Sequence, residues 1–271
     1  MNMPLTMQGR VCDCIQLNYR TPGETIRTLL PDGLEPVVRG PWAFWNVMCC
    51  RVEKLRPAGL PALCGLTYHH VAYRLRVQAM NDRAEVVQGL YFTRSEVDAK
   101  AVSIVGNKLT DLRMHPAAIA MEASDCGVHC KIEGNSQGSG MELVTAHAPA
   151  RLQPGSCFPS VEDARQFCRY TACALAVTDR DGRRHLRTTR VSRSAHAWNE
   201  TPLAVHQARM GHFESIGQAE HVRLEWACRL SAMDYTWRVG ETAALLKQPA
   251  YVNERNRQAT PGGQLQHAPA S

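Results

Sequence analysis

The sequence lacks any apolar run long enough to cross a membrane. Its first residues, MNMPLTMQGR, also lack a basic segment followed by an apolar one. A spanning helix needs about 18 or more consecutive apolar residues, and a secretory signal needs both a basic and an apolar segment. We therefore expect a soluble, cytoplasmic protein with no membrane partner.

The cysteine pattern argues against the common zinc sites. No C-x-x-C occurs among the 11 cysteines, whereas structural zinc sites usually combine two closely spaced pairs of ligands. Cys126, His129 and Cys130 are close in sequence, but single cysteines of this kind behave as small buried hydrophobes. In a cytoplasmic chain they should be reduced. We predict no metal and no other cofactor.

Sequence signatures of several catalytic and nucleic-acid-binding classes are absent as well. There is no G-x-S-x-G elbow, phosphate-binding loop, G-x-G-x-x-G motif or H-E-x-x-H motif. The net charge is +6, but the 31 basic residues are dispersed among 25 acidic ones, and only residues 180–190 are dense in arginine. Because that segment has no aromatic residues for base stacking, we expect a solvated hairpin and no nucleic-acid partner.

What the sequence does contain is a succession of short segments rich in aromatic and β-branched residues, separated by Gly, Pro or Asn-Asp turn signals. Strands are expected at 42–52, 67–78, 85–94, 101–105, 119–122, 127–133, 141–152, 172–178, 184–192, 202–210, 220–231 and 234–239. The alternation in Tyr73–Val77 places Arg74 and Arg76 on one face of a strand and apolar residues on the other.

Two helices are expected beside these strands. Thr21 and Glu24 have the spacing of a capping box for a helix that continues to about residue 30. Ser160, followed by acidic residues, should cap a second helix that ends near residue 170.

The order of these elements predicts the fold class. Strands outnumber helices and do not alternate with them, so we expect a mainly β (α+β) protein whose sheet is closed or sandwiched. A single domain should span residues 1–252. The polar segment 253–271 can bury little surface and should be a disordered tail.

Several segments together resemble a known family. They are LLPDGLEP, WAFWNV, a Tyr-His-His strand, GLYFTRSEVDAKAV, GNKLTDLRMHPAAI and HAWNETPLAVHQARM. In this order the chain resembles the bacterial DUF2071 proteins, which are grouped with the acetoacetate decarboxylase-like fold, over roughly residues 20–240. The resemblance implies an antiparallel β-barrel or cone with a few peripheral helices around a central cavity, and it allows a homo-oligomer.

The resemblance also raises the question of a Schiff-base lysine. Acetoacetate decarboxylase uses a lysine whose pKa is lowered by a neighbouring lysine and an apolar cavity. Laid on that motif, Gly106 takes the glycine, Lys108 takes the glutamate, and Met114 and His115 stand where the lysine pair should be. The family's nucleophile is therefore missing. Lys108 could be an exposed lysine, an active amine or an anion-binding lysine at the cavity mouth.

Eight residues are predicted for the cavity. Ligand contacts are assigned to Tyr68, Arg74, Tyr91, Asn107 and Trp198. The catalytic candidates are His70, His115 and Lys108. His69 and His70 are adjacent on a strand, so only one of them can face inward. An inward Arg74 could bind a carboxylate through two parallel hydrogen bonds.

Three functions stay open at this level. The first is non-covalent binding of a small acidic or aromatic metabolite in the cavity. The second is a lyase or isomerase that acts on a small keto acid, with a histidine as acid or base. The third is a structural module that binds a partner through a strand edge. Whether the protein is an enzyme is therefore undecided by the sequence.

Overall fold

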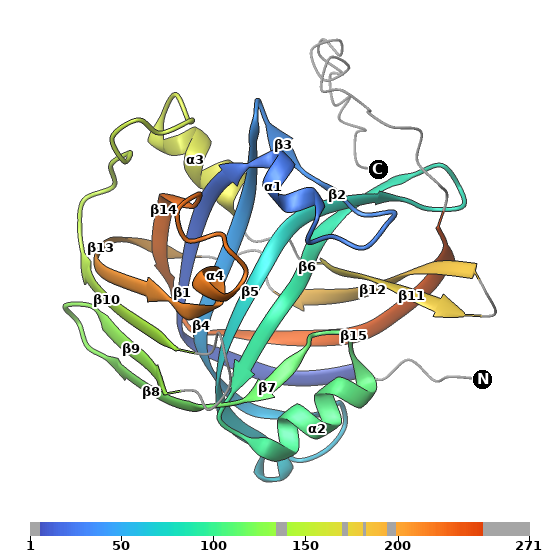
Figure 1. Ribbon diagram of the computed structural model, residues 1–271. Helices are drawn as coiled ribbons and strands as arrows, with labels where there is room; N and C mark the ends of the chain where they lie inside the picture. The colour runs from blue at the N-terminus through green and yellow to red at the C-terminus, as the bar shows by residue number, and fades with distance from the viewer. Residues whose placement is uncertain (1–5, 134–139, 170–172, 181–182, 194–198, 246–271) are drawn as a thin grey trace, which may run out of the picture.

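The protein is mainly β, as the sequence predicted (Figure 1). The computed structural model describes residues 6–133, 140–169, 173–180, 183–193 and 199–245. The strands of the first half are β1 (Thr6–Pro22), β2 (Glu35–Pro36), β3 (Val38–Arg39), β4 (Trp42–Pro57), β5 (Leu66–Met80), β6 (Val86–Val97), β7 (Met114–Pro116) and β8 (Ala118–Ala123). Those of the second half are β9 (Val128–Glu133), β10 (Met141–His147), β11 (Cys173–Arg180), β12 (Arg183–Arg193), β13 (Glu200–Met210), β14 (Arg223–Leu230) and β15 (Met233–Ala244). The helices are α1 (Gly23–Arg27), α2 (Lys100–Leu109), α3 (Val161–Cys168) and α4 (Gly211–Ser215), with a 3₁₀ turn, η1, at Ala62–Cys64.

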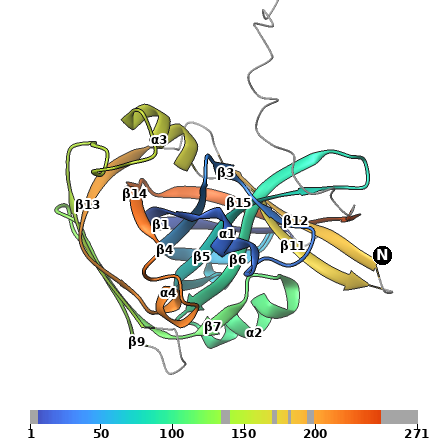
Figure 2. The same cartoon turned by 45° about the horizontal axis from the view of Figure 1, so that its top comes forward.

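The central strands close into a ring. Their order is β4-β5-β6-β11-β12-β15-β1, and β1 pairs with β4 as well as with β15. β14, β13, β10, β9 and β8 continue from β1 in that order and form a second layer outside the ring (Figures 1 and 2). The ring closes between β6 and β11 through one parallel residue pair, Leu90 and Ala174, and closure of this kind protects strand edges.

Both faces of β5 are buried along most of its length, and they pack against different partners. On β5, Val71, Tyr73 and Leu75 belong to a core that includes residues of β9 and β10 and Phe213 of α4. The alternate residues of β5, including His70, point to the inside of the ring, where they line a cavity. The polar residues of β5 therefore alternate with apolar ones because they face the cavity, not because they face solvent.

The longest strand, β1, was not predicted from the sequence. It pairs with β4, β14 and β15 and therefore lies at the centre of the sheet. Its sequence, CDCIQLNYR, alternates polar or cysteine residues with apolar ones. That pattern is typical of a strand, but the polar residues are buried inside the ring rather than exposed.

The strand predicted at 101–105 is wrong, because these residues belong to helix α2. The β-branched residues of this segment suggested a strand. However, Ala101, Val105 and Leu109 recur every four residues and face the cavity in the ring, which is the spacing of one helix face. The local β propensity was therefore overruled by the packing of α2 against the end of the ring, where Val102 is buried.

The two expected helix starts fared differently. Ser160 caps α3 as predicted, since its hydroxyl oxygen accepts a hydrogen bond from the Asp163 amide at 3.1 Å. The capping box at Thr21 is wrong: α1 begins after Pro22 without a side-chain cap and ends at Arg27. Thr21 instead lies at the end of β1, where its buried hydroxyl contacts Gln218.

The structure also bears on the arginine-rich segment, on membrane-spanning segments and on the predicted tail. The arginine-rich segment forms the hairpin of β11 and β12, where Arg180 pairs with Arg183 across the ladder. In the described part of the chain, no helix has the length and hydropathy needed to span a membrane. The predicted tail at 253–271 lies outside the described residues.

One glycine provides a test of the packing between β9 and β10. A Cβ at Gly127 would lie 2.0 Å from the Thr145 carbonyl oxygen, which belongs to the backbone and cannot rotate away. We expect Gly127→Ala to lower the free energy of unfolding by about 1–3 kcal/mol. Gly140→Ala is the matched control, because no atom lies within 4 Å of its added Cβ. Equal unfolding midpoints in urea for the two variants would contradict this close approach.

Candidate functional site

A cavity of about 230 Å³ lies inside the ring. Residues of β1, β4, β5, β6, β11, β12, β14 and β15 line its wall, and α2 lies across one end of it (Figure 1). Most of the lining side chains are apolar. At ~30 Å³ for each water molecule in the liquid, this space corresponds to about eight waters, so it suits a small organic molecule.

Two β-bulges decide which side chains reach the cavity. At Asp13, which has a positive φ of 49°, the register of β1 against β4 shifts. Val11 faces the cavity before this bulge, and Cys14 and Gln16 face it after the bulge. The register of β4 shifts in the same way around Lys54, at a φ of 53°. An extra residue in one strand reverses the side-chain alternation beyond it.

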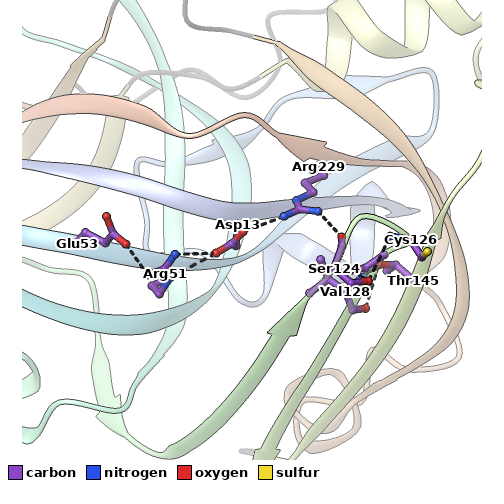
Figure 3. Close-up of polar contacts among 9 residues, drawn as sticks. Asp13, Arg51, Glu53, Ser124, Cys126, Val128, Thr145 and Arg229 are labelled. Atoms are coloured by element: carbon purple, nitrogen blue, oxygen red, sulfur yellow. Dashed lines mark hydrogen bonds and ion pairs between the residues drawn. The ribbon is translucent and has the colours of Figure 1, made fainter.

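Asp13 is held in its unusual conformation by two arginines outside the cavity (Figure 3). Its carboxylate accepts hydrogen bonds from Arg51 of β4 at 3.1 Å and from Arg229 of β14 at 2.9 Å. Arg229 also donates to the carbonyl oxygen of Ser124, between β8 and β9, and Arg51 pairs with Glu53. This network connects three strands and the second layer, and it stabilises the bulge that turns Cys14 inward.

The polar part of the cavity wall is built around Arg74. Arg74 is 1% exposed, and its guanidinium donates a hydrogen bond to Asn46 Oδ1. The Asn46 amide group in turn donates to Asn18 Oδ1 at 2.7 Å. The ring of Phe92 lies 5.7 Å from the guanidinium carbon. A buried cation is therefore positioned by neutral amides and an aromatic ring at the edge of an apolar cavity.

His70 and Gln16 offer hydrogen-bonding atoms to this space. His70 Nε2 and both side-chain polar atoms of Gln16 are buried and have no hydrogen-bond partner within the described chain. Both residues line the cavity. Leaving a buried polar atom without a partner costs about 1–3 kcal/mol, so a bound molecule that supplies partners would relieve that cost.

The charges along the cavity wall are all of one sign. Arg74 and Arg193 line it, whereas no Asp, Glu or Lys of the described residues does. Burial, followed by the positive charge of Arg74, lowers the pKa of His70 to about 3. His70 is therefore neutral near pH 7, and the net charge of the lining is positive. An anion is the complementary ligand.

The low pKa of His70 predicts a pH dependence of stability. The unfolded histidine titrates near pH 6.5, so between about pH 3 and 6.5 the unfolded chain binds more protons than the folded one. The contribution of His70 to stability is complete above pH 6.5 and is lost as the pH falls, by up to about 1.4 kcal/mol per pH unit. We expect His70→Gln to weaken this dependence in urea titrations between pH 4.5 and 7.

A matched variant separates this effect from a general loss of stability. His129 is an exposed histidine of β9, and His129→Gln should retain the pH dependence of the unmodified protein. His212, whose pKa burial and Arg94 lower to about 4, should supply the slope that remains in His70→Gln. A slope unchanged by His70→Gln would contradict a buried, neutral His70.

The predicted site residues divide into two groups. Tyr68, His70 and Arg74 alternate along β5 and all line the cavity. Their neighbour His69 points away and contacts Asp98, with Nδ1 and Oδ2 separated by 2.8 Å. The guanidinium of Arg76 lies 4.3 Å from the ring centre of Phe167 on α3, so it does not share the cavity with Arg74.

Four other predicted residues, all within the described chain, do not line the cavity. Lys108 is exposed on α2. The Asn107 side-chain amide donates a hydrogen bond to the Met114 carbonyl oxygen and accepts one from the Met114 backbone N–H, each at 2.7 Å. These two bonds join α2 to β7. His115 is exposed on β7, and Tyr91 is buried in the core outside the ring, with Arg113 over its ring at 5.1 Å. Trp198 lies outside the described residues.

Two pairs of cysteines are brought together by the strands. The neighbouring Cys14 thiol, followed by burial, raises the pKa of Cys50, and both residues line the cavity. The Cys130 thiol, followed by burial, raises the pKa of Cys49 in the outer core. The Cys49 and Cys50 thiols are therefore protonated at neutral pH. Among the described residues, no group of three or more His, Cys, Asp or Glu is placed to hold a metal ion.

Sequence reasoning missed Gln16, which lines the cavity, and the Asn18–Asn46 pair, in which Asn46 accepts a hydrogen bond from Arg74. These residues come from strands that meet only in the folded ring. The alternation of residues 14–20 was a usable signal, because it places Cys14, Gln16 and Asn18 on one face of a strand. No local signal identified Arg193, which comes from β12.

Comparisons with known proteins agree with this architecture. The family model DUF2071, described as an uncharacterized conserved protein, matches residues 9–215. No functionally curated protein matches the chain. An acetoacetate decarboxylase-like enzyme from Sphingomonas wittichii RW1 has a similar structure, with a TM-score of 0.58 and 13% identity over 92% of this chain and 95% of that one.

Two further solved structures share the fold. Acetoacetate decarboxylase from Legionella pneumophila has a TM-score of 0.57 and 11% identity, with 91% of this chain and 90% of that one covered. The enduracididine biosynthesis enzyme MppR, in complex with pyruvate, has a TM-score of 0.56 and 11% identity, with 91% and 92% covered. At these identities the similarity establishes the fold and leaves the chemistry to the residues of the cavity.

Proposed function

Because the chain belongs to the DUF2071 family and has the fold of acetoacetate decarboxylase-like proteins, we propose that its cavity binds a small acidic or aromatic metabolite without covalent chemistry. Arg74 is the residue that would hold the carboxylate. Its guanidinium can bind two carboxylate oxygens at once. Tyr68, His70 and Gln16 would contact the same ligand from neighbouring positions on the wall.

The observation that carries the proposal is the buried Arg74 in an otherwise mainly apolar cavity. A guanidinium in an apolar wall attracts an anion more strongly than one in bulk water does, because the local dielectric constant is lower. The apolar remainder of the wall suits the carbon skeleton or aromatic ring of the same ligand. A small carboxylate with an apolar body satisfies both parts of the wall.

Covalent catalysis through a Schiff base has less support. Such chemistry needs a lysine amine inside the cavity, and none of the described lysines lines it. A lyase or isomerase that uses His70 as a base would need a pKa near the working pH, whereas the pKa of His70 is lowered to about 3. Non-covalent binding is therefore the function that these residues favour.

The proposal is tested by a ligand screen with a covalent trap. Pairs of carboxylates and their neutral amides, such as benzoate with benzamide, are compared by thermal shift. We expect carboxylates to raise the melting temperature and the amides to have little effect. Keto acids such as pyruvate and acetoacetate are then incubated with the protein and reduced with borohydride, and we expect no added mass. An adduct mapped to Lys108 or another lysine would contradict the proposal.

A further inference from the structure

Large apolar side chains are exposed around the mouth of the cavity. Among the described residues, the exposed large apolar side chains are Leu60, Leu63, Leu66, Val86, Ile104 and Val105. All of these except Val86 lie on the β4–β5 connection, at the first residue of β5 or on α2, at the same end of the ring (Figure 1). Leu66 and Val105 also line the cavity, so this group surrounds its entrance. We call these five residues the mouth patch.

Basic residues flank the mouth patch, and acidic residues are absent from its two segments. Residues 54–67 and 99–110 contain no Asp or Glu. Lys54, Lys100 and Lys108 are exposed, and none of them forms an ion pair within the described chain. On α2, Lys100, Ile104 and Lys108 recur every four residues and therefore share one face of the helix.

The β4–β5 connection is an ordered support for its leucines. Arg56 donates hydrogen bonds to the carbonyl oxygens of Leu60 at 2.9 Å and Lys54 at 2.8 Å. The backbone of Gly65 packs so closely on Lys54 that an added Cβ would lie 2.5 Å from its carbonyl carbon. The connection is thus held against β4, and it presents Leu63 with 89% of its surface exposed.

We propose that the mouth patch docks the protein reversibly on an anionic lipid surface. A projecting leucine and an isoleucine flanked by lysines can enter the interfacial region while the ammonium groups stay at the headgroups. Each lysine near the surface adds attraction to anionic lipids. The expectation of no membrane partner concerned spanning segments, and a surface contact needs none.

The position of the mouth patch favours a lipid surface over a protein partner. The apolar side chains are distributed over a loop and a helix, and Leu60, Leu63 and Ile104 are exposed without lining the cavity. Docking would bring the entrance of an apolar cavity to the bilayer surface. The inference rests on the exposed residues and their charges, and it stands whether or not Arg74 binds a carboxylate.

The test is sedimentation of the full chain with vesicles of phosphatidylcholine alone or mixed with phosphatidylglycerol. We expect binding to the mixed vesicles only, with loss at high salt because the Debye length shortens. Leu63→Glu and Ile104→Glu, two exposed residues that do not line the cavity, should each weaken binding by about tenfold. Val86→Glu is the matched control, since Val86 is 50% exposed but lies on β6 outside the mouth patch.

Charge and self-association are tested in parallel. The double variant Lys100→Gln/Lys108→Gln should also lose at least about tenfold in binding to the mixed vesicles. The melting temperature of each variant is measured to show that it remains folded. No binding to the mixed vesicles at low salt would overturn the proposal. A dimer in light scattering that Leu63→Glu dissociates, without vesicle binding, would overturn it in favour of a second copy of the chain.

Discussion

Arg74→Met should lower the affinity of the cavity for small carboxylates by about 10- to 150-fold, since a hydrogen bond to a charged group contributes ~1.5–3 kcal/mol. Methionine is close to arginine in length and suits an apolar wall, but it has neither the charge nor the paired N–H groups. The prediction is measured by titration calorimetry with the carboxylates that raise the melting temperature of the unmodified protein. Neutral amides should bind both proteins alike.

Two variants of β5 separate charge from general damage to the strand. Arg74→Lys keeps the charge and loses the planar guanidinium, so its affinity for carboxylates should fall between those of the unmodified protein and Arg74→Met. Arg76 lies two residues further along the strand but contacts the ring and the carbonyl oxygen of Phe167 on α3. Arg76→Met should therefore leave carboxylate affinity unchanged. Equal affinities for Arg74→Met and the unmodified protein would refute the proposed role of the cavity cation.

The second large effect is expected in the core between the ring and the outer layer. Trp45 is fully buried on β4, and its ring packs edge-on against His212 at 6.3 Å and Phe213 at 5.1 Å. Trp45→Ala removes these contacts and leaves a large hole, so we expect a loss of about 3–5 kcal/mol in the free energy of unfolding. Domains are stable by only about 5–15 kcal/mol, so the variant should be close to unfolding.

Trp45→Phe is the matched control for this core. The indole nitrogen of Trp45 is buried and has no hydrogen-bond partner within the described chain. Phenylalanine keeps much of the aromatic surface and removes that nitrogen, so its cost should be well below that of alanine. Both variants are compared by urea denaturation followed by circular dichroism. A loss below about 1 kcal/mol for Trp45→Ala would show that α4 does not pack on β4 as described.

The strands that sequence reasoning identified correctly share one property. Segments such as 67–78 and 127–133 combine β-branched and aromatic residues with clear turn signals at their ends. Both became strands, β5 and β9. In these segments local preference and tertiary burial agree, so the local signal is sufficient.

The errors arose where local preference and tertiary burial disagree. Residues 101–105 are rich in β-branched side chains but form part of α2, because a helix at this point covers the end of the ring. Strand β1 carries Gln16 and Asn18 at buried positions, which is unusual for a strand at the centre of a sheet. Their burial becomes intelligible only in the folded ring, where Gln16 lines the cavity and Asn18 accepts a hydrogen bond from Asn46.

From the sequence alone, the mainly β class, the resemblance to the family, the absence of the decarboxylase lysine pair and the placement of Tyr68, His70 and Arg74 on one face of a strand could be stated. These depend on composition, motif order and the two-residue period of a strand, which are local properties. Only the tertiary structure decided that Lys108 lies outside the cavity, that Asn46 supports Arg74 and that the bulges at Asp13 and Lys54 reverse the alternation. These features depend on ring closure and strand register, which join residues far apart in the chain.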